Sequence, residues 1–398
     1  MHILLLPSWY PTPADPVNGV FFRDQIEALR NHSNLRIGVL APLVKPWARC
    51  GTVAADPRDI HGVVTMRAAT RAWLPGCVPH WNARAWHHTA TRLLHGYVER
   101  HGWPDLVHAH AALYAGWTAH CWKKQFGLPY LVTEHSTAFA RQALHNWQSA
   151  LAAKAFQSAD ERIAVSPALA AHLAAEFGGD WQVLPNPVAV RFDRPAITQY
   201  RPGQPFRFVH LAALTQKKRQ QDLIDAFARV AAETSVPIEL EIGGDGPMSA
   251  ELKAHASRTA AAHRITFTGR IDPVAVPRFM ERGHCFMLTS AHETFGVVVA
   301  EALSCGLPVI TTRCGGPEGL VGEDDGEVVA PGDVRGLAAA MQRCLAAADR
   351  CDHDGIAHRA RLRFSGAAIA QSTLALYHRQ PPHVPATSLQ IRHALSHV

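Results

Sequence analysis

Short apolar runs alternate with longer amphipathic segments along most of the chain. In the first half, the apolar runs predict buried strands at residues 3–6, 35–40, 106–109, 130–133 and 162–165. The segments between them have the apolar spacing of helices, for example at residues 19–30, 83–100 and 144–158. Strands that alternate with helices in this way form a parallel sheet covered by helices.

The pattern breaks near Val183, and proline and arginine are dense from there to Pro205, so this region is interpreted as a linker. Beyond it the apolar runs predict strands at residues 207–211, 238–242, 265–268, 285–289, 308–311 and 326–329. Helices are predicted between them, for example at residues 220–233 and 297–305. The sequence therefore predicts an α/β protein with two Rossmann-like domains that face each other across a deep cleft, where such architectures bind ligands.

Length and composition agree with this division. The chain has 398 residues, enough for two domains, and 47% hydrophobic with 18% charged residues is typical of a folded globular protein. No apolar run approaches the ~18 residues of a membrane span. The apolar start lacks a basic leader and a cleavage site, so it predicts a first strand and not a signal peptide. The eight cysteines include no C-x-x-C pair, which favours free thiols in the reducing cytoplasm.

Charge is unevenly distributed along the chain. The net charge is +6, and residues 36–104 alone carry nine Lys or Arg against three Asp or Glu. All ten tryptophans lie at or before Trp181. One interpretation is a solvated basic face over an aromatic-rich core; the other is a surface for an anionic partner, such as a lipid diphosphate at the inner face of a membrane. Nucleic acid is not an expected partner, because no nucleic-acid-binding motif is present.

The stretch at residues 293–301 has the pattern of an anion site. A strand ends near Ser290 and a helix begins near Gly296, whose free backbone N–H groups and helix dipole suit a diphosphate. Glu301, inside the helix, is placed to accept hydrogen bonds from ribose hydroxyls. Glu293 precedes the helix, where a transferred sugar would lie. Two glutamates eight residues apart also occur by chance, so both acids remain open to being solvated surface groups.

The wider segment resembles the retaining family 4 of GT-B glycosyltransferases. It matches each fixed position of E-x-F-G-x-x-x-x-E-A-x-x-x-G-x-P-V from Glu293 to Val309, and a glycine turn with an acid, ending at Glu318, follows. The resemblance implies a GT-B fold and a metal-independent hexosyltransferase with a nucleotide-diphosphate sugar, UDP- or GDP-linked, as donor and no cofactor. It assigns Glu293 a catalytic role and donor binding to Thr294, Phe295, Gly296, Val297, Val298 and Glu301.

Residues 214–227 resemble the segment that carries the family's diphosphate lysine. The alignment places Lys218 at that position as a catalytic residue, with Lys217 as the alternative register. The family usually has an arginine five residues earlier, where this chain has Ala213. Either Arg219 or another cation replaces that arginine, or Lys218 and the helix amides suffice.

Other turns continue the resemblance. Gly244 lies in a G-x-G-x-G-P-like turn, and Arg270 and Ile271 follow Gly269 in a turn whose backbone faces the nucleobase in relatives. In the first half, Gly19 opens a helix near the phosphates and acceptor. His135, after a strand, is the candidate polar contact to the transferred sugar, with a purely structural histidine as the alternative. His108 and His110 lack further ligands at zinc-like spacing, so no metal is expected.

The predicted function is sugar transfer to a hydroxyl of a glycan or lipid-linked acceptor, in polysaccharide biosynthesis, by a cytoplasmic protein peripheral to the membrane. Residues 1–190 would form the acceptor-binding domain and 200–365 the nucleotide-sugar domain. A helix at about 366–380 would cross back onto the first domain, and 381–398 would be a loose tail. The alternatives are a nucleotide-sugar epimerase on the same scaffold and a non-catalytic nucleotide-sugar or glycan binder.

Overall fold

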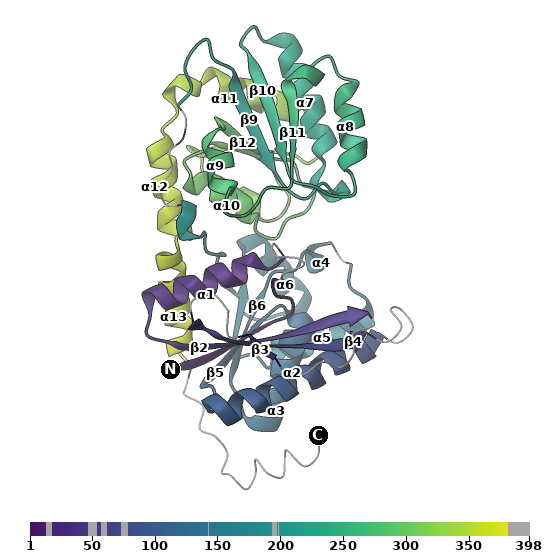
Figure 1. Cartoon of the computed structure of the whole chain (residues 1–398), viewed down its shortest axis with the longest axis vertical. Helices are drawn as coiled ribbons and strands as arrows, with labels where there is room; N and C mark the ends of the chain where they lie inside the picture. Colours follow the sequence, from purple (N-terminus) through teal and green to yellow (C-terminus); the bar gives the residue numbers. More distant parts are fainter. Residues whose placement is uncertain are drawn as a thin grey trace. The chain divides into compact units, whose positions relative to one another are not determined.

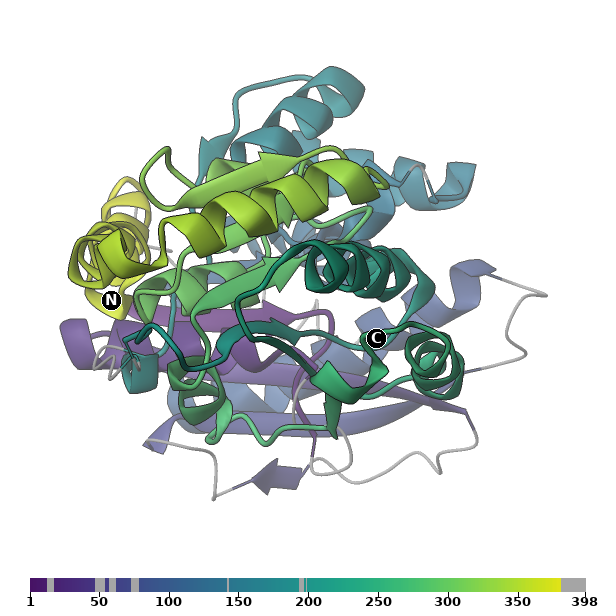
Figure 2. The same ribbon diagram turned by 90° about the horizontal axis from the view of Figure 1, so that it is seen from above.

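The computed structural model describes residues 1–12, 18–46, 54–56, 62–72, 79–141, 143–192, 197 and 199–380. The chain divides into two compact units, each built on a β-sheet with helices on both faces (Figures 1 and 2). The first unit comprises Met1–Val165, Ala170–Pro185 and the chain from Ile369 onward; the second comprises Ser166–Leu169 and Asn186–Ala368. The predicted tail at 381–398 lies outside the described residues.

The sheet of the first unit is almost entirely parallel. Within the described ranges it has eight strands in the order β3-β4-β2-β1-β5-β6-β7-β8, and β3 alone runs antiparallel to its neighbour. The strands are β1 (His2–Pro7), β2 (Arg36–Pro46), β3 (Ala54–Asp56), β4 (Val64–Ala72), β5 (Leu106–His110), β6 (Tyr130–Glu134), β7 (Glu161–Ala164) and β8 (Gln182–Val183).

Helices cover both faces of this first sheet. Apolar side chains of α1 and α13 share one core with β1 and β5, while α2 packs on β2 and β4. Figure 1 shows α1 on one side of the sheet and α2 and α3 on the other. The helices are α1 (Val20–His32), α2 (Pro79–His101), the π-helix η2 (Ala112–Gly116), α3 (Trp117–Phe126), α4 (Thr137–Ala140), α5 (Asn146–Gln157), α6 (Pro167–Phe177) and α13 (Gly366–His378).

The second unit contains a parallel sheet of six strands among its described residues, in the order β11-β10-β9-β12-β13-β14. Leu223 and Phe227 of α7 and Met341 of α11 pack into the core on one face, with Phe208 and Leu240 of the sheet. The strands are β9 (Phe206–Leu211), β10 (Ile238–Gly243), β11 (Ile265–Gly269), β12 (Cys285–Leu288), β13 (Val309–Thr312) and β14 (Gly326–Val329).

In the second unit α7, α8, α9 and α10 lie in the crossovers between parallel strands, whereas α11 and α12 follow the last strand, β14. In Figure 1, α7 and α8 lie to one side of the sheet and α9 and α10 to the other. The α-helices are α7 (Gln220–Glu233), α8 (Ser249–Ser257), α9 (Val276–Glu281), α10 (Val297–Ser304), α11 (Val334–Ala346) and α12 (His353–Phe364). The short 3-10 turns are η3 (Val190–Phe192), η4 (Gln216–Lys218), η5 (Ala262–Arg264), η6 (Pro317–Gly319) and η7 (Ala348–Arg350).

The strands and helices predicted from the apolar pattern are confirmed, with ends shifted by a few residues. Strand β2 extends to Pro46, beyond the predicted end at residue 40. Strand β4 was not predicted, because Arg67 and Thr70 interrupt its apolar residues. Its Met66 is buried under α2, so only alternate positions of this strand carry the apolar signal.

A buried hydrogen bond ties the last described helix to the first sheet. The Tyr377 hydroxyl of α13 and the His108 Nδ1 of β5 are 2.7 Å apart, and His108 Nε2 is 2.7 Å from the Thr133 hydroxyl. Burial lowers the pKa of His108 to about 3, so the imidazole is neutral. The neutral ring provides one donor and one acceptor, which match these two hydroxyl partners.

We predict that Tyr377→Phe destabilises the first unit. The change leaves His108 Nδ1 buried without its partner, which costs about 1–3 kcal/mol. Thermal unfolding followed by calorimetry measures the loss. Tyr200→Phe is the matched control. It removes the same hydroxyl group, and among the described residues the Tyr200 hydroxyl forms no hydrogen bond. Equal melting temperatures for Tyr377→Phe and the unmodified chain would contradict the prediction.

Candidate functional site

Two of the predicted catalytic residues contact each other at the carboxyl edge of the second sheet. Lys218 lies in η4 after β9, and Glu293 lies in the loop after the neighbouring strand β12. The Lys218 ammonium donates to Glu293 Oε1, and the two side chains are only 14% and 11% exposed. The Ser290 hydroxyl donates to the same carboxylate oxygen at 2.8 Å. An ammonium and a carboxylate therefore share a largely desolvated position.

Hydrogen bonds to main-chain carbonyls join the two loops that carry this pair. The amide of Ala291 donates to the carbonyl of Lys217 at 2.8 Å. The Thr289 hydroxyl donates to the carbonyl of Lys218 at 3.0 Å. These contacts fix η4 against the end of β12, so the position of the Lys218 side chain is set by the sheet itself.

His210 near the end of β9 belongs to the same site, and the sequence analysis did not identify it. Its ring is fully buried, with Nδ1 2.9 Å from the Met287 carbonyl and Nε2 3.3 Å from the Gln220 amide nitrogen. Burial lowers its pKa to about 4, and the nearby Lys218 charge acts in the same direction. The available signal was a histidine beside the apolar residues Val209 and Leu211 of a strand.

Gly315 and Gly316, in the turn after β13, pack against the loop that carries Glu293. A Cβ on Gly315 would lie 2.8 Å from the Glu293 carbonyl oxygen, and one on Gly316 would lie 2.5 Å from the Phe295 nitrogen. The Glu318 carboxylate accepts hydrogen bonds from the amides of Cys314 and Gly315. The glycine turn after β13 is therefore shaped to let the backbone around Glu293 lie directly upon it.

The helix α10 begins where the sequence predicted. Gly296 precedes it in a left-handed conformation, φ 86° and ψ 60°, and no side chain caps the first turn. The first amides of a helix, here those of Val297 and Val298, lack partners within the helix, so they are available to an anion. Thr294 and Phe295 are buried, and the Phe295 ring packs on Phe364 of α12 at 6.0 Å. The Phe295 side chain therefore anchors the loop in the core.

Glu301 lies partly buried on α10, in the second turn of the helix. It is close enough to Cys305 to affect that thiol, whose pKa is raised to about 12 mainly by burial and further by the Glu301 charge. Glu301 lies five residues after Gly296, the residue that precedes α10. Its carboxylate is therefore about one and a half turns from Gly296.

The turns after β10 and β11 lie together at the same edge. The Gly244 amide donates to the Gly269 carbonyl at 2.8 Å, and Gly244 has φ 119° with its α-carbon packed against the Ala212 carbonyl. Ile271 lies over Gly243, where an added Cβ would be 2.7 Å from the Ile271 side chain. Arg270 is exposed.

The arginine expected five residues before Lys218 has no replacement in Arg219. Ala213 is exposed at the strand end, and the Arg219 guanidinium forms hydrogen bonds with the Asp222 carboxylate at 2.6 and 3.2 Å. Arg219 is therefore committed to the first turn of α7. The cation that contacts Glu293 is therefore the Lys218 ammonium.

The first unit holds the other two predicted residues. Gly19 adopts a left-handed conformation, φ 81°, immediately before α1. Phe21 of that helix contacts the ring of His135 at 5.0 Å between centroids, and His135 Nε2 is 3.1 Å from His110 Nδ1. Burial lowers the pKa of His135 to about 3, so the imidazole is neutral. The structure thus brings the start of α1 and His135 to the carboxyl edge of the first sheet.

Glu134, next to His135, is a buried acid that the sequence analysis did not assign a role. It is fully buried at the end of β6 and accepts hydrogen bonds from three main-chain amides. Burial raises its pKa to about 7, and the three amide contacts oppose that rise. As with His210, the signal was a polar side chain at the end of a buried strand.

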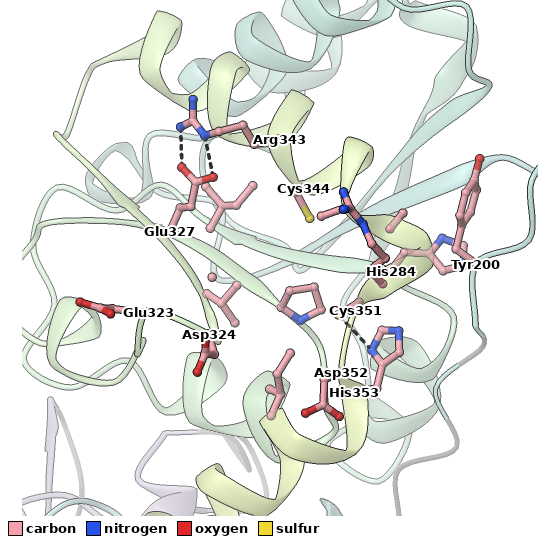
Figure 3. A pocket seen from close by; sticks show the side chains of 18 of the residues that line it. Tyr200, His284, Glu323, Asp324, Glu327, Arg343, Cys344, Cys351, Asp352 and His353 are labelled. Atoms are coloured by element: carbon pink, nitrogen blue, oxygen red, sulfur yellow. Dashed lines mark hydrogen bonds and ion pairs between the residues drawn. The ribbon is translucent and has the colours of Figure 1, made fainter.

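A cavity of about 610 Å³ lies at the opposite edge of the second sheet (Figure 3). Its walls include Phe206, His284 and Pro308, at the amino ends of strands, and the ion pair between Arg343 and Glu327. Lys218 and Glu293 follow the carboxyl ends of the strands, so this cavity is separate from the candidate site. Among the described residues no three His, Cys, Asp or Glu side chains form a metal-binding group.

Two known protein families match consecutive parts of the chain. Glycosyl transferases group 1 matches residues 197–360, and Glycosyltransferase Family 4 matches residues 52–192. The chain belongs to the GT-B glycosyltransferases of the group 1 and family 4 type. Together the two matches cover most of the chain, and the first includes every candidate residue of the second unit.

Curated relatives of this family are similar over different shares of their length. TuaC of Bacillus subtilis (strain 168), a glycosyltransferase assigned to teichuronic acid biosynthesis, is 27% identical over 361 residues, 86% of this chain and 89% of TuaC. N-acetyl-alpha-D-glucosaminyl L-malate synthase of Bacillus anthracis is 34% identical over 131 residues, 33% of each chain. The chain spans 33% to 47% of the length of that synthase and of several other curated relatives.

Solved structures share the two-domain GT-B fold. Sucrose-phosphate synthase of Thermosynechococcus elongatus has a TM-score of 0.76 and 20% identity, covering 95% of this chain and 99% of its own. HepE of Anabaena in complex with UDP has a TM-score of 0.73 and 19% identity, covering 96% and 100%. At this identity the likeness establishes the fold, which confirms the fold class predicted from sequence.

We predict that Lys218→Met weakens binding of UDP or GDP roughly 10- to 100-fold, because a charge-assisted contact to phosphate is lost. Isothermal titration with the nucleotide that binds the unmodified protein measures the loss. Lys217→Met tests the alternative register and should bind as the unmodified protein does.

The double variant Lys218→Met with Glu293→Gln controls for the carboxylate that the single change leaves unpaired. Its affinity should stay low, since the phosphate contact is still missing. Recovery of nucleotide affinity in the double variant would mean that Lys218 only neutralises Glu293.

Proposed function

We propose that the protein transfers a sugar from a nucleotide-diphosphate sugar to a hydroxyl of a glycan or lipid-linked acceptor, with retention of the anomeric configuration. The observation that carries the proposal is the Lys218–Glu293 pair beside the uncapped start of α10. A cation and a helix start at one sheet edge make an anion site, and the adjoining carboxylate supplies a polar group for the sugar.

The diphosphate would bind the first amides of α10 and the Lys218 ammonium. The ammonium donates to Glu293, whose carboxylate also accepts a hydrogen bond from Ser290. A phosphate oxygen would draw the ammonium toward the leaving group and leave Glu293 free to accept a sugar hydroxyl. Charge that develops on the nucleoside diphosphate would then be stabilised without a metal.

The nucleoside would lie against the turns at Gly244 and Arg270, with Glu301 accepting hydrogen bonds from the ribose hydroxyls. UDP is supported as the donor nucleotide by the complex of HepE with UDP. GDP remains the second candidate, because a GDP-mannose-dependent mannosyltransferase of Mycobacterium tuberculosis is 33% identical over 119 residues. On the acceptor side, the neutral His135 imidazole would donate or accept one hydrogen bond with a hydroxyl of the transferred sugar.

Titration with UDP, GDP and ADP and their sugar conjugates tests the donor. The expected result is one preferred nucleotide, release of that nucleotide from its sugar conjugate, and a product whose anomeric signal in NMR matches that of the donor. Conversion of the donor sugar to an epimer without acceptor would support the epimerase alternative. Binding without turnover, whichever acceptor is supplied, would support the non-catalytic binder.

Glu301→Ala should lower donor affinity about 10-fold or more, because hydrogen bonds from the ribose to a charged acceptor are lost. Comparison with a 2′-deoxy and a 3′-deoxy nucleotide makes the test specific. An analogue that lacks a hydroxyl contacted by Glu301 should bind the unmodified protein more weakly than the full nucleotide does. In Glu301→Ala, that analogue and the full nucleotide should bind with equal affinity. A persisting penalty in the variant would exclude Glu301 as the ribose contact.

We also propose that the first unit lies against an anionic membrane surface. No helix among the described residues is long and apolar enough to span a bilayer. Along α2, however, four exposed side chains recur three or four residues apart, namely Trp81, Arg84, His88 and Arg92. Trp81 is 54% exposed. An indole followed by two arginines on the same helix face suits the interface of an anionic bilayer.

We predict that Arg84→Glu with Arg92→Glu abolishes binding to vesicles of phosphatidylglycerol, each lost cation costing about 1 kcal/mol. Co-sedimentation at low and high salt measures it, with phosphatidylcholine vesicles as the neutral comparison. The control is Arg229→Glu with Arg335→Glu, which makes the same charge change at exposed positions of the second unit. Equal losses for the two pairs would mean that net charge matters and the α2 face does not.

A further inference from the structure

The carboxylate of Glu134 holds the main chain at three places. Its Oε1 accepts from the amides of His135 at 2.9 Å and Ser136 at 2.7 Å, and its Oε2 accepts from the amide of Ala112 at 2.8 Å. The side chain is completely buried. An acid in such a position is costly unless its oxygens are bonded, so these three amides are what makes it tolerable.

The segment that Glu134 holds across the sheet has an unusual backbone. Ala111 and Tyr114, neither of them glycine, have φ of 69° and 70°, and ψ at Tyr114 is −68°. These conformations cost about 1–3 kcal/mol each and persist only where surrounding contacts impose them. Residues 111–114 overlap the start of η2, but Leu113 and Tyr114 have non-helical backbone angles, so this segment is a turn between β5 and α3, hereafter the β5 turn.

Two further contacts impose this conformation. The Ser8 hydroxyl, just after β1, donates to the Leu113 carbonyl at 2.5 Å and accepts from the Ala115 amide at 3.1 Å. The Tyr114 ring stacks on Trp86 of α2, with centroids 6.0 Å apart and planes at 21°. The β5 turn is thus held by Glu134 from β6, by Ser8 from β1 and by α2.

The position of the β5 turn suggests a functional reason for its strained backbone. It lies at the carboxyl edge of a parallel sheet, where ligands bind in folds of this kind. Leu113 and Tyr114 are partly exposed there, while His135 follows directly after Glu134 on the adjacent strand. One buried carboxylate therefore fixes both a strained turn and the backbone of the candidate sugar contact.

We propose that Glu134 is a positioning residue for sugar transfer: through the amides of Ala112 and His135 it holds the β5 turn and the His135 imidazole in the arrangement that the reaction requires. This rests on the proposed function. A carboxylate offers acceptors on both oxygens, whereas a glutamine offers one oxygen and a donor N–H₂ group. In Glu134→Gln the N–H₂ group would face either the Ala112 amide or those of His135 and Ser136.

The test compares turnover with nucleotide binding in Glu134→Gln. The probe is the nucleoside diphosphate released from UDP-glucose, UDP-N-acetylglucosamine or GDP-mannose, whichever the unmodified protein turns over. We expect kcat to fall about 10- to 100-fold, since a displacement on the order of 1 Å near the reacting atoms has that effect. The dissociation constant of the nucleotide should stay the same, because Lys218 and the α10 amides, the proposed diphosphate contacts, belong to the other unit and Glu134 does not contact Gly19.

Glu161→Gln is the matched control. It makes the same substitution in the same sheet, at the first residue of β7 and so at the opposite edge. Its kcat should equal that of the unmodified protein. Because nucleotide binding reports on the second unit, folding of the first unit is checked separately, by comparing the circular dichroism and melting temperature of each variant with those of the unmodified protein.

Ser8→Ala keeps the proposal falsifiable if Glu134→Gln does not fold, because it loosens the same turn from a partly exposed position. Its kcat should also fall, with nucleotide affinity retained. Where both variants fold, the double variant should lose less than the product of the two single losses, since both act on one turn. Unchanged kcat in Glu134→Gln, or in Ser8→Ala where the first variant does not fold, overturns the proposal. Absence of turnover by the unmodified protein would instead refute the proposed function.

Discussion

The contact between Lys218 and Glu293 is the constraint around which the candidate site of the second unit is arranged. An ion pair with so little exposure pays a desolvation cost that is recovered only when geometry is good and other polar groups assist. Ser290 assists the carboxylate, and main-chain bonds join the two loops. The Lys218–Glu293 pair is therefore supported both by a hydroxyl donor and by the contact between its two loops.

A parallel sheet is what allows such a pair to form between residues 75 positions apart. Because the strands run in one direction, the loops after β9, β12 and β13 all emerge at the same edge. The same rule operates in the first unit, where Ser8, the β5 turn and Glu134 meet after β1, β5 and β6. Each sheet thus presents a polar edge above an apolar core, although the two edges share no motif.

The sequence predicts the second unit better than the first. The pattern around Glu293 predicts a strand, a turn and a helix start within a dozen residues, and the structure confirms Gly296 at the start of α10, while the anion site there stays a prediction. Lys218 required the family resemblance, because nothing local distinguishes it from Lys217. His210 and Glu134 were not assigned roles, because each depends on tertiary contacts and reads in sequence only as a polar interruption of a strand. The β5 turn has no signal at all, since alanine and tyrosine rarely adopt positive φ.

The absence of an arginine at position 213 changes what the Lys218–Glu293 pair has to do in the proposed site. With Ala213 at that position and Arg219 bound to Asp222, the cationic side of the described site consists of Lys218. In the proposed site a single ammonium would not neutralise a diphosphate, so the α10 amides would provide a larger share of the stabilisation than in a site with two cations. That makes the backbone geometry at Gly296 more important here. Gly315 and Gly316 pack closely against the loop from Glu293 to Phe295, which leads into α10. This packing helps to hold the first α10 amides in one orientation, so it contributes to the electrostatics of the site as well as to its shape.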